Sequence, residues 1–471
     1  MTATTVEHVE PKHWRETVAG ALARGARFAS AWATRRTDGT TWHALLVSPG
    51  ATCVLTTDVG AGKVDSIIDI VEAAAWDERE GHDLYGLEFD GHEPMRALVA
   101  HPEDSAAWTI PVTGDGVHEV AVGPIHAGVI ESGHFRFHVV GERILAMDPR
   151  LFYKHRGLER AAEGHSADEA LPFVGRACAA CAVANTVAYA HAVENALGLW
   201  PDRELREQRT MLLELERLYN HLHDISAICA GVGFAPGSMA FAALKDRAQR
   251  INERAVGHRF LFGCVAVAKG TIELDQRAVN FALSELRDLR VDAAAAWRDL
   301  EFAGTMQARL DDVGVLARED ARRLGAVGPA ARAAGERNDV RSASPRLWYW
   351  DFAPAVVAGS TGDVAARLRL RAAELETTCD ILEDMLARPV RPGTATHERE
   401  PTEIGIGRVE SPRGATTCSV ELDQGRVARL HLRTGSYANW PALAHATAGN
   451  LLPDFPLINK SFELCYACVD R

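Results

Sequence analysis

The chain has 471 residues, of which 47% are hydrophobic, and a formal net charge of −13 at pH 7. This length allows one large core or two, and ordinary domain sizes predict two or three domains. The negative charge argues against nucleic acid as a main partner, because binding to a phosphate backbone depends on basic patches.

No segment is typical of a secretory signal or of a membrane span. The first ten residues lack both a basic start and an apolar core. The most apolar run, residues 261–268, is shorter than the roughly 20 residues that cross a bilayer. We therefore expect a soluble, cytoplasmic chain that contacts a membrane only through partner subunits. Its nine cysteines are then expected to be thiols or metal ligands rather than disulfides.

The first 118 residues have a mixed pattern of helix and strand. Apolar side chains near helical spacing predict a helix over residues 11–32. Two strands are expected at 42–47 and 51–56, joined by the turn residues Ser48-Pro-Gly50. Residues 101–120 are rich in turn residues and are expected to contain the linker to the second part.

An acidic stretch lies in this first part, Trp76-Asp-Glu-Arg-Glu80, followed by Asp83-Leu-Tyr-Gly86 and Phe89-Asp-Gly-His92. From the residues alone it is a helix with a carboxylate-rich face and a following loop. The stretch also closely resembles the signature of the 30-kilodalton-type subunit of respiratory complex I. That subunit is a scaffold without a cofactor, so the resemblance implies a packing and docking role for these acids.

The second part begins with a predicted β-hairpin and continues mainly as helices. The hairpin is expected from alternation at 135–147, with its turn at Gly141-Glu142. Small apolar residues over 176–199 predict a closely packed buried helix. A leucine stripe over 205–222 predicts an amphipathic helix whose glutamates lie on the opposite face, toward solvent or a partner. His221 and His223 on this helix are expected to serve in packing.

Further helices and two strands follow along the chain. We expect a helix pair over 239–268 and a strand-turn-strand unit near the end. The loop expected at 325–335 comes instead from the family that the cysteine pairs below resemble. The remaining expected segments are helices at 274–303, 318–323 and 362–386, and strands at 416–422 and 426–433.

Two C-x-x-C pairs frame the second part, Cys178-Ala-Ala-Cys181 and Cys465-Tyr-Ala-Cys468. Each pair brings two soft thiolates to one metal ion. Zinc sites built from two such pairs usually have about 15–20 residues between them, whereas here 182–464 intervene. A thioredoxin-type disulfide would leave the other pair unexplained. One four-thiolate site is therefore favoured, and zinc or a plain iron centre stays open because ligand type alone does not decide the metal.

The pair Arg176-Ala-Cys178-Ala-Ala-Cys181 and the segment Asn459-Lys-Ser-Phe-Glu-Leu-Cys-Tyr-Ala-Cys-Val-Asp-Arg471 together resemble the large subunit of nickel-iron hydrogenases. The resemblance is to the membrane-bound, energy-converting group of the formate hydrogenlyase type, which is related to the 49-kilodalton subunit of complex I. A third motif, Glu410-Ser-Pro-Arg-Gly414, matches a hydrogenase signature, although Pro-Arg-Gly in isolation is simply a turn.

The resemblance implies an α+β fold with two domains. Residues 1–118 would form a small α/β module of the 30-kilodalton type. Residues 119–471 would form a mainly helical large-subunit domain with small peripheral sheets.

The resemblance also implies a nickel-iron centre whose iron carries carbon monoxide and cyanide. Cys178 and Cys465 would be terminal ligands of nickel, and Cys181 and Cys468 would bridge to iron. Arg413 would sit over the metals as a fixed positive charge.

The same resemblance implies roles for two glutamates. Glu131, in Glu131-Ser-Gly-His134, would relay protons from the nickel, although on the residues alone it is a solvated turn acid. Glu159 would help to hold a magnesium-type ion or a carboxylate network behind the site. On the residues alone, Glu159 is a solvated acid in the first turn of a helix.

One residue departs from the family pattern, and the resemblance also implies partner proteins. Asn185 stands where a histidine normally donates a hydrogen bond to a cysteine sulfur, and Asn can still donate. Arg471 lies three residues after Cys468, where a maturation protease would cut, so either the sequence is the processed form or the gene never encodes an extension. The hydrogenase maturation machinery is an expected partner. The others are an iron-sulfur small subunit, because the remaining cysteines are solitary, and a membrane arm.

An alternative function of a different class stays open. The chain would then be a structural and coupling subunit of a complex I-like assembly that binds no nickel. Nothing in the sequence decides whether formate, carbon monoxide or ferredoxin is the redox partner, or in which direction the reaction runs.

Overall fold

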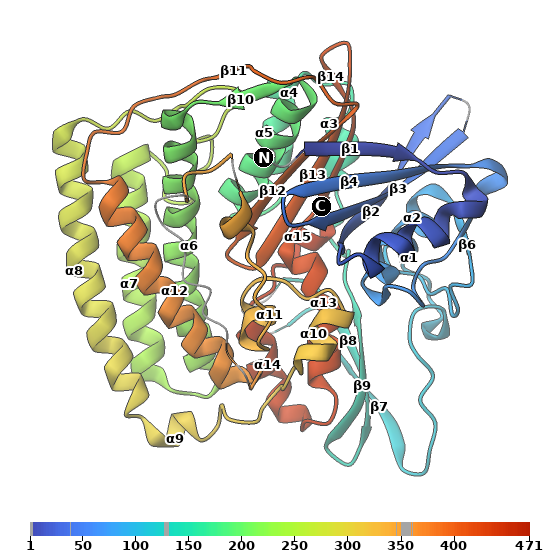
Figure 1. Ribbon diagram of the computed structural model, residues 1–471. Helices are drawn as coiled ribbons and strands as arrows, with labels where there is room; N and C mark the ends of the chain where they lie inside the picture. The colour runs from blue at the N-terminus through green and yellow to red at the C-terminus, as the bar shows by residue number, and fades with distance from the viewer. Residues whose placement is uncertain (1–2, 38, 127–130, 345, 350–358, 360) are drawn as a thin grey trace.

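The computed structural model describes residues 3–37, 39–126, 131–344, 346–349, 359 and 361–471. Figure 1 shows a small sheet of N-terminal strands on one side, a second sheet of C-terminal strands in the middle, and a bundle of long helices on the other side. This arrangement confirms the predicted α+β fold, with a small N-terminal module followed by a mainly helical domain.

A four-stranded sheet in the order β1-β4-β3-β2 forms the N-terminal module. Strand β1 pairs with β4 in parallel, and the other pairs are antiparallel. The predicted strands at 42–47 and 51–56 are thereby confirmed. The strands are β1 (Ala3–His8), β2 (Arg27–Arg36), β3 (Gly39–Ser48) and β4 (Ala51–Val59), with a parallel pair of short strands, β5 (Lys63–Asp65) and β6 (Glu88–Asp90). The helices are α1 (Trp14–Ala23) and α2 (Ala75–Tyr85).

The helix predicted over residues 11–32 was wrong in its second half. Helix α1 ends at Ala23, and the chain turns at Gly25, whose φ of +92° suits glycine. The next residues enter β2, where Ala31 and Trp32 are buried against the module and its neighbours. Pairing within the sheet therefore overrides the helical propensity of this Ala/Arg-rich segment.

The acids of α2 are buried and paired, as the packing role predicted. Asp77 is 3% exposed and accepts a hydrogen bond from Arg433 Nε at 2.9 Å. Glu78 accepts hydrogen bonds from Ser66 and from the backbone N–H of Ile67. The helix approaches the sheet so closely that a Cβ at Gly81 would lie 2.8 Å from the Trp42 ring. Its charged face is thus an internal contact surface.

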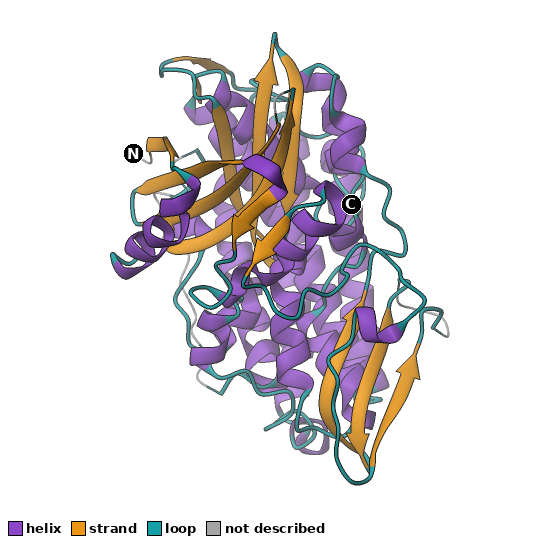
Figure 2. Ribbon diagram, turned by 90° about the vertical axis from the view of Figure 1, so that its right-hand side faces the viewer, coloured by secondary structure: helices purple, strands orange, loops and turns teal. Residues whose placement is uncertain are grey.

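The larger part begins with a separate three-stranded sheet, β7-β8-β9, which contains the predicted hairpin. This sheet lies apart from the other strands at one end of the molecule (Figure 2). The strands are β7 (Val117–Val122), β8 (His134–Val140) and β9 (Arg143–Arg150). Residue 118, where we placed the domain boundary, falls within β7, and the boundary stays a prediction.

Long helices dominate the rest of the chain, with α6, α7, α8 and α12 forming the bundle seen in Figure 1. The helices from here on are α3 (Leu158–Ala162), α4 (Ala167–Gly175), α5 (Ala182–Ala196), α6 (Arg203–Gly231), α7 (Ala235–Val256), α8 (Gln276–Glu301), α9 (Gly304–Gln307), α10 (Arg318–Arg323), α11 (Gly328–Ala333), α12 (Val364–Met385), α13 (Gly435–Thr447), α14 (Phe455–Phe462) and α15 (Ala467–Asp470). The predicted helices near 176–199, 205–222, 274–303, 318–323 and 362–386 are confirmed, although α5 begins only after the first cysteine pair.

Three expectations for these segments were wrong. The predicted helix pair over 239–268 is one helix, because α7 ends at Gly257, which has a φ of +84°. The expected loop at 325–335 contains α11. The glutamates of α6 do not all face solvent, since Glu214 and Glu216 are fully buried. Glu214 accepts hydrogen bonds from neighbouring hydroxyl groups, and Glu216 accepts them from two backbone N–H groups at the start of α5.

A three-stranded antiparallel sheet, β12-β13-β14, packs against α5 between the module and the bundle. The contact requires small residues, because a Cβ at Gly407 would lie 1.9 Å from the carbonyl oxygen of Ala188. The strand-turn-strand unit predicted at 416–433 is confirmed as β13 and β14. The strands are β12 (Ile404–Ser411), β13 (Gly414–Asp423) and β14 (Arg426–Arg433), with a separate pair β10 (Leu199–Pro201) and β11 (Ala395–His397).

No helix in the described ranges is long and apolar enough to cross a membrane.

Candidate metal centre

The four cysteines of the two C-x-x-C pairs lie together, although almost the whole second part of the chain separates the pairs. Cys178 and Cys181 occupy the turn just before α5, and Cys465 and Cys468 lie between α14 and the end of α15. The sulfurs of Cys468 and Cys178 are 2.9 Å apart. The sulfurs of Cys178, Cys465 and Cys468 all lie within 4.8 Å of one another. The first pair and Cys468 are buried, and Cys465 is partly exposed.

Local backbone geometry suits these sulfurs to act as thiolates. The backbone N–H of Cys181 donates to Cys178 Sγ at 3.1 Å, and that of Cys468 donates to Cys465 Sγ at 3.4 Å. Hydrogen bonds from the Cys178 and Cys468 side chains lower the pKa of Cys181, and hydrogen bonds from the same two residues lower the pKa of Cys465. The same shared hydrogen bonds raise the pKa of Cys178 and Cys468, so two of the four thiols ionise readily while the other two hold the protons. Four soft sulfur donors in one cluster fit a soft divalent metal.

Arg413 lies beside the cysteines, at the turn between β12 and β13. Its Nη1 donates to Asn220 Oδ1 at 2.6 Å, its Nη2 to Asp224 Oδ1 at 2.9 Å, and its Nε to the carbonyl oxygen of Glu463 at 2.9 Å. Burial works against its charge, but the carboxylate of Asp224 outweighs this and raises the pKa of Arg413. The guanidinium is therefore a fixed positive charge next to the sulfurs.

Two residues that hold Arg413 escaped the sequence analysis. Asn220 and Asp224 lie one helical turn apart on α6, both essentially unexposed. Asp224 also accepts a hydrogen bond from Arg371 Nε at 2.9 Å. The available signal was their spacing of four residues, which places two short polar side chains on one face of the helix, in line with Glu216.

Glu131 lies next to the second cysteine pair, as its expected role requires. Its Oε2 accepts a hydrogen bond from the backbone N–H of Ala467 at 2.7 Å. Burial, followed by the nearby Cys465 sulfur, raises the pKa of Glu131. Residues 127–130 before it lie outside the described part of the chain. The approach is close, since a Cβ at Gly133 would lie 2.6 Å from the Tyr466 ring.

Glu159 lies in an ionic network behind the cysteines. Arg429 Nη1 is 3.0 Å from its Oε2, and Arg471 Nη1 is 2.9 Å from its Oε1. Arg471 also pairs with Glu80 on α2. Glu80, Glu159 and His431 could together offer ligand atoms to a cation, but two guanidiniums already take the carboxylate oxygens. Of the two expected roles for Glu159, this arrangement therefore fits a carboxylate network better than a magnesium site.

Asn185 reaches the cysteine cluster from α5. Its Nδ2 lies 3.9 Å from Cys468 Sγ, at donor distance for a sulfur acceptor. The side chain is fully buried. It therefore sits where the sequence analysis expected a donor to a cysteine sulfur.

The sequence also matches known protein families. Residues 8–113 match the family described as respiratory-chain NADH dehydrogenase 30 Kd subunit. Residues 232–404 and 392–471 match the respiratory-chain NADH dehydrogenase 49 Kd subunit. The chain is 32% identical over 444 residues to hydrogenase-4 component G of Escherichia coli K12, covering 88% of this chain and 77% of that protein. It belongs to the family of energy-converting hydrogenase large subunits with fused complex I-type domains.

A second relative supports this family assignment, and a solved structure shares the fold. Formate hydrogenlyase subunit 5 of Escherichia coli K12 is 31% identical over 467 residues, covering 91% of this chain and 81% of that protein. A chain of the membrane-bound sulfane sulfur reductase, an archaeal respiratory membrane complex, aligns with a TM-score of 0.69 at 24% identity, over 77% of this chain and 100% of that chain. That likeness shows the fold alone. The resemblance predicted from the cysteine motifs is confirmed, and the family is one of oxidoreductase subunits.

Proposed function

We propose that this hydrogenase-family chain is the catalytic large subunit of a nickel-iron hydrogenase. The observation that carries the proposal is the convergence of Cys178, Cys181, Cys465 and Cys468 in one cluster. These four thiolates would hold the metals. When bound, a nickel-iron centre with carbon monoxide and cyanide on iron supplies reversible cleavage of dihydrogen.

The chain's own residues then have distinct tasks. Arg413, fixed by three acceptors, would place positive charge and hydrogen-bond donors over the centre. Glu131 would take the proton that leaves through a cysteine sulfur, because its carboxyl group hydrogen bonds within the second pair and burial raises its pKa. Asn185 would tune Cys468 through its amide N–H.

Electrons would leave through a separate iron-sulfur small subunit. The five other cysteines are spread over different elements, in β4, α6, the loop after α7, α12 and β13, whereas a cluster needs several cysteines together. A membrane arm would anchor the assembly, with this chain peripheral on the cytoplasmic face, and the maturation machinery would insert the metals.

The alternative is a coupling subunit that binds no nickel. The fold shared with a chain of the sulfane sulfur reductase complex favours it, because the same architecture occurs in a complex named for a different activity. The presence of all four cysteines favours the hydrogenase.

A matched pair of cysteine substitutions tests the proposal. Cys468→Ser should abolish both nickel retention and hydrogen-linked dye reduction in the complex purified with its small subunit. Cys229→Ser is the control, because Cys229 is equally buried and lies in α6 away from the cluster. Burial raises the pKa of Cys229 to about 12, so its thiol stays neutral. Unchanged nickel content in Cys468→Ser, measured by mass spectrometry, would show that the four-thiolate site is wrong.

A further inference from the structure

A large cavity lies between the N-terminal module and the larger domain, away from the cysteines. Its volume is about 630 Å³, and it is lined by Thr4 and Thr52 of the module together with His191 of α5. His191 lies ten residues after Cys181, which corresponds to about 15 Å along a helix. The cavity is thus separate from the candidate metal centre.

Arginines dominate the lining of this cavity, which we call the interdomain arginine cavity. The charged residues that line it are Arg27, Arg337, Arg346, Arg399, Arg408 and Asp339. Arg27 pairs with Glu336 at 3.0 Å and Arg346 with Glu194 at 3.5 Å, while the lining carboxylate of Asp339 pairs with Arg341 Nη2 at 2.7 Å. Asp339 is therefore not free to neutralise the other arginines, and the lining keeps a net positive charge.

Two of these arginines make no ion pair or hydrogen bond through their side chains with any described residue. Arg408 projects from β12, and its Nε is buried without an acceptor. Burial lowers the pKa of Arg408 to about 10, and Glu410 offsets this only in part. Arg337 is exposed at the mouth of the same cavity. Arg408 is half-buried, and its buried Nε without an acceptor carries a desolvation cost, so an anion would be bound favourably here.

His191 adds a buried donor to the same cavity. Its side chain is 1% exposed, and its Nε2 has no hydrogen-bond partner in the described part of the chain. Burial, with help from Arg209 and Arg346, holds the pKa of His191 well below its usual value. The imidazole is therefore neutral at physiological pH and has a ring nitrogen available to a ligand.

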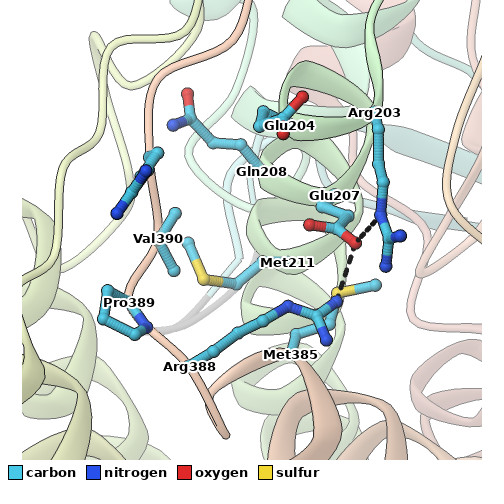
Figure 3. Close-up of a pocket in the computed structure, with 10 residues that line it drawn as sticks. Arg203, Glu204, Glu207, Gln208, Met211, Met385, Arg388, Pro389 and Val390 are labelled. Atoms are coloured by element: carbon cyan, nitrogen blue, oxygen red, sulfur yellow. Dashed lines mark hydrogen bonds and ion pairs between the residues drawn. The ribbon is translucent and has the colours of Figure 1, made fainter.

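Two arginines of another large cavity differ from Arg337 and Arg408, because they pair with a carboxylate. That cavity, about 420 Å³, lies between α6 and the end of α12 (Figure 3). There Glu207 Oε1 accepts from Arg203 Nε at 2.8 Å and from Arg388 Nη2 at 2.7 Å. Glu207 thus compensates Arg203 and Arg388 within the protein, so Arg388 is a suitable control residue.

We propose that the interdomain arginine cavity binds a small anion bearing phosphate groups. The volume suits a small molecule, and the planar fork of a guanidinium matches phosphate oxygens in bidentate geometry. Since both parts of the chain line the cavity, the ligand stabilises the docking of the module on the larger domain. This inference goes beyond the proposed hydrogenase function and does not depend on nickel.

Calorimetric titration of the full-length protein tests the inference, with pyrophosphate and inorganic phosphate as probes at low ionic strength. Pyrophosphate should bind at one site per chain. Arg408→Gln and Arg337→Gln should each weaken its affinity at least ~10-fold, as expected for loss of charge-assisted hydrogen bonds. Arg388→Gln should leave the affinity unchanged. Arg337→Gln keeps the test decisive if Arg408→Gln fails to fold, because Arg337 is exposed.

Three outcomes would overturn the inference. They are equal affinity in Arg408→Gln and wild type, weakening by Arg388→Gln as large as by Arg337→Gln, and binding of citrate as tight as pyrophosphate. The last result would indicate a carboxylate ligand, such as an acidic segment of a partner subunit. The metal-free Cys468→Ser variant should bind pyrophosphate like wild type, so failure of the hydrogenase proposal and failure of this one are distinguishable.

Discussion

Replacing Asp224 by asparagine should destabilise the protein strongly, because one buried carboxylate serves two buried arginines. Asp224 pairs with Arg371 and Arg413 at 2.9 Å each, and all three side chains are at most 3% exposed. Asparagine keeps the shape but removes the charge, leaving two guanidiniums without a counter-ion. Removal of one partner from a buried pair costs about 3–5 kcal/mol, and we expect a loss of this size in the free energy of unfolding.

The same substitution at an exposed pair provides the control. Asp292 pairs with Arg247, with side-chain exposures of 58% and 33%, and such pairs contribute about 0–1 kcal/mol. Urea unfolding of both variants, followed by far-ultraviolet circular dichroism, measures the difference. If Asp224→Asn loses no more stability than Asp292→Asn, the charge of Asp224 does not hold the arginines and our account of Arg413 fails.

Three further outcomes are expected. Gly81→Ala should cost about 1–3 kcal/mol by overpacking, since the new Cβ would lie 2.8 Å from the Trp42 ring, and a variant as stable as wild type in thermal unfolding would contradict this. Burial, with nearby arginines, holds the pKa of His43 well below 6.5. The unfolded chain therefore takes up the proton first as pH falls below about 6.5, and stability should fall by up to about 1.4 kcal/mol per pH unit for this group. His43→Gln should reduce that slope, and an unchanged slope would count against a neutral buried histidine. Glu131→Gln should slow hydrogen–deuterium exchange activity while nickel content stays at the wild-type level, whereas loss of nickel would indicate a structural role.

Much of the fold followed from the sequence because the helices and strands carry clear periodicity. The α6 leucine stripe, the small apolar residues of α5 and the β8–β9 alternation all predicted elements that the structure contains. The errors arose where tertiary contacts override local preference. Residues 27–36 have helical composition, yet they complete a sheet, and Glu214 finds buried partners that a helical wheel does not show.

The residues of the candidate site that belong to sequence motifs could be predicted, and the others could not. The cysteine pairs, Arg413 and Glu131 are each marked by neighbouring residues, and the structure brings them together. Asn220 and Asp224 carry no motif, because their role depends on Arg413, which lies 189 residues away from Asp224. Such long-range pairing is invisible to periodicity and spacing.

An infrared spectrum of the complex purified with its small subunit tests the central claim most directly. The account predicts stretching bands of metal-bound carbon monoxide and cyanide, which should disappear in Cys468→Ser and persist in Cys229→Ser. Absence of these bands from mature wild-type complex would contradict a nickel-iron centre at the four cysteines and would favour the coupling subunit instead.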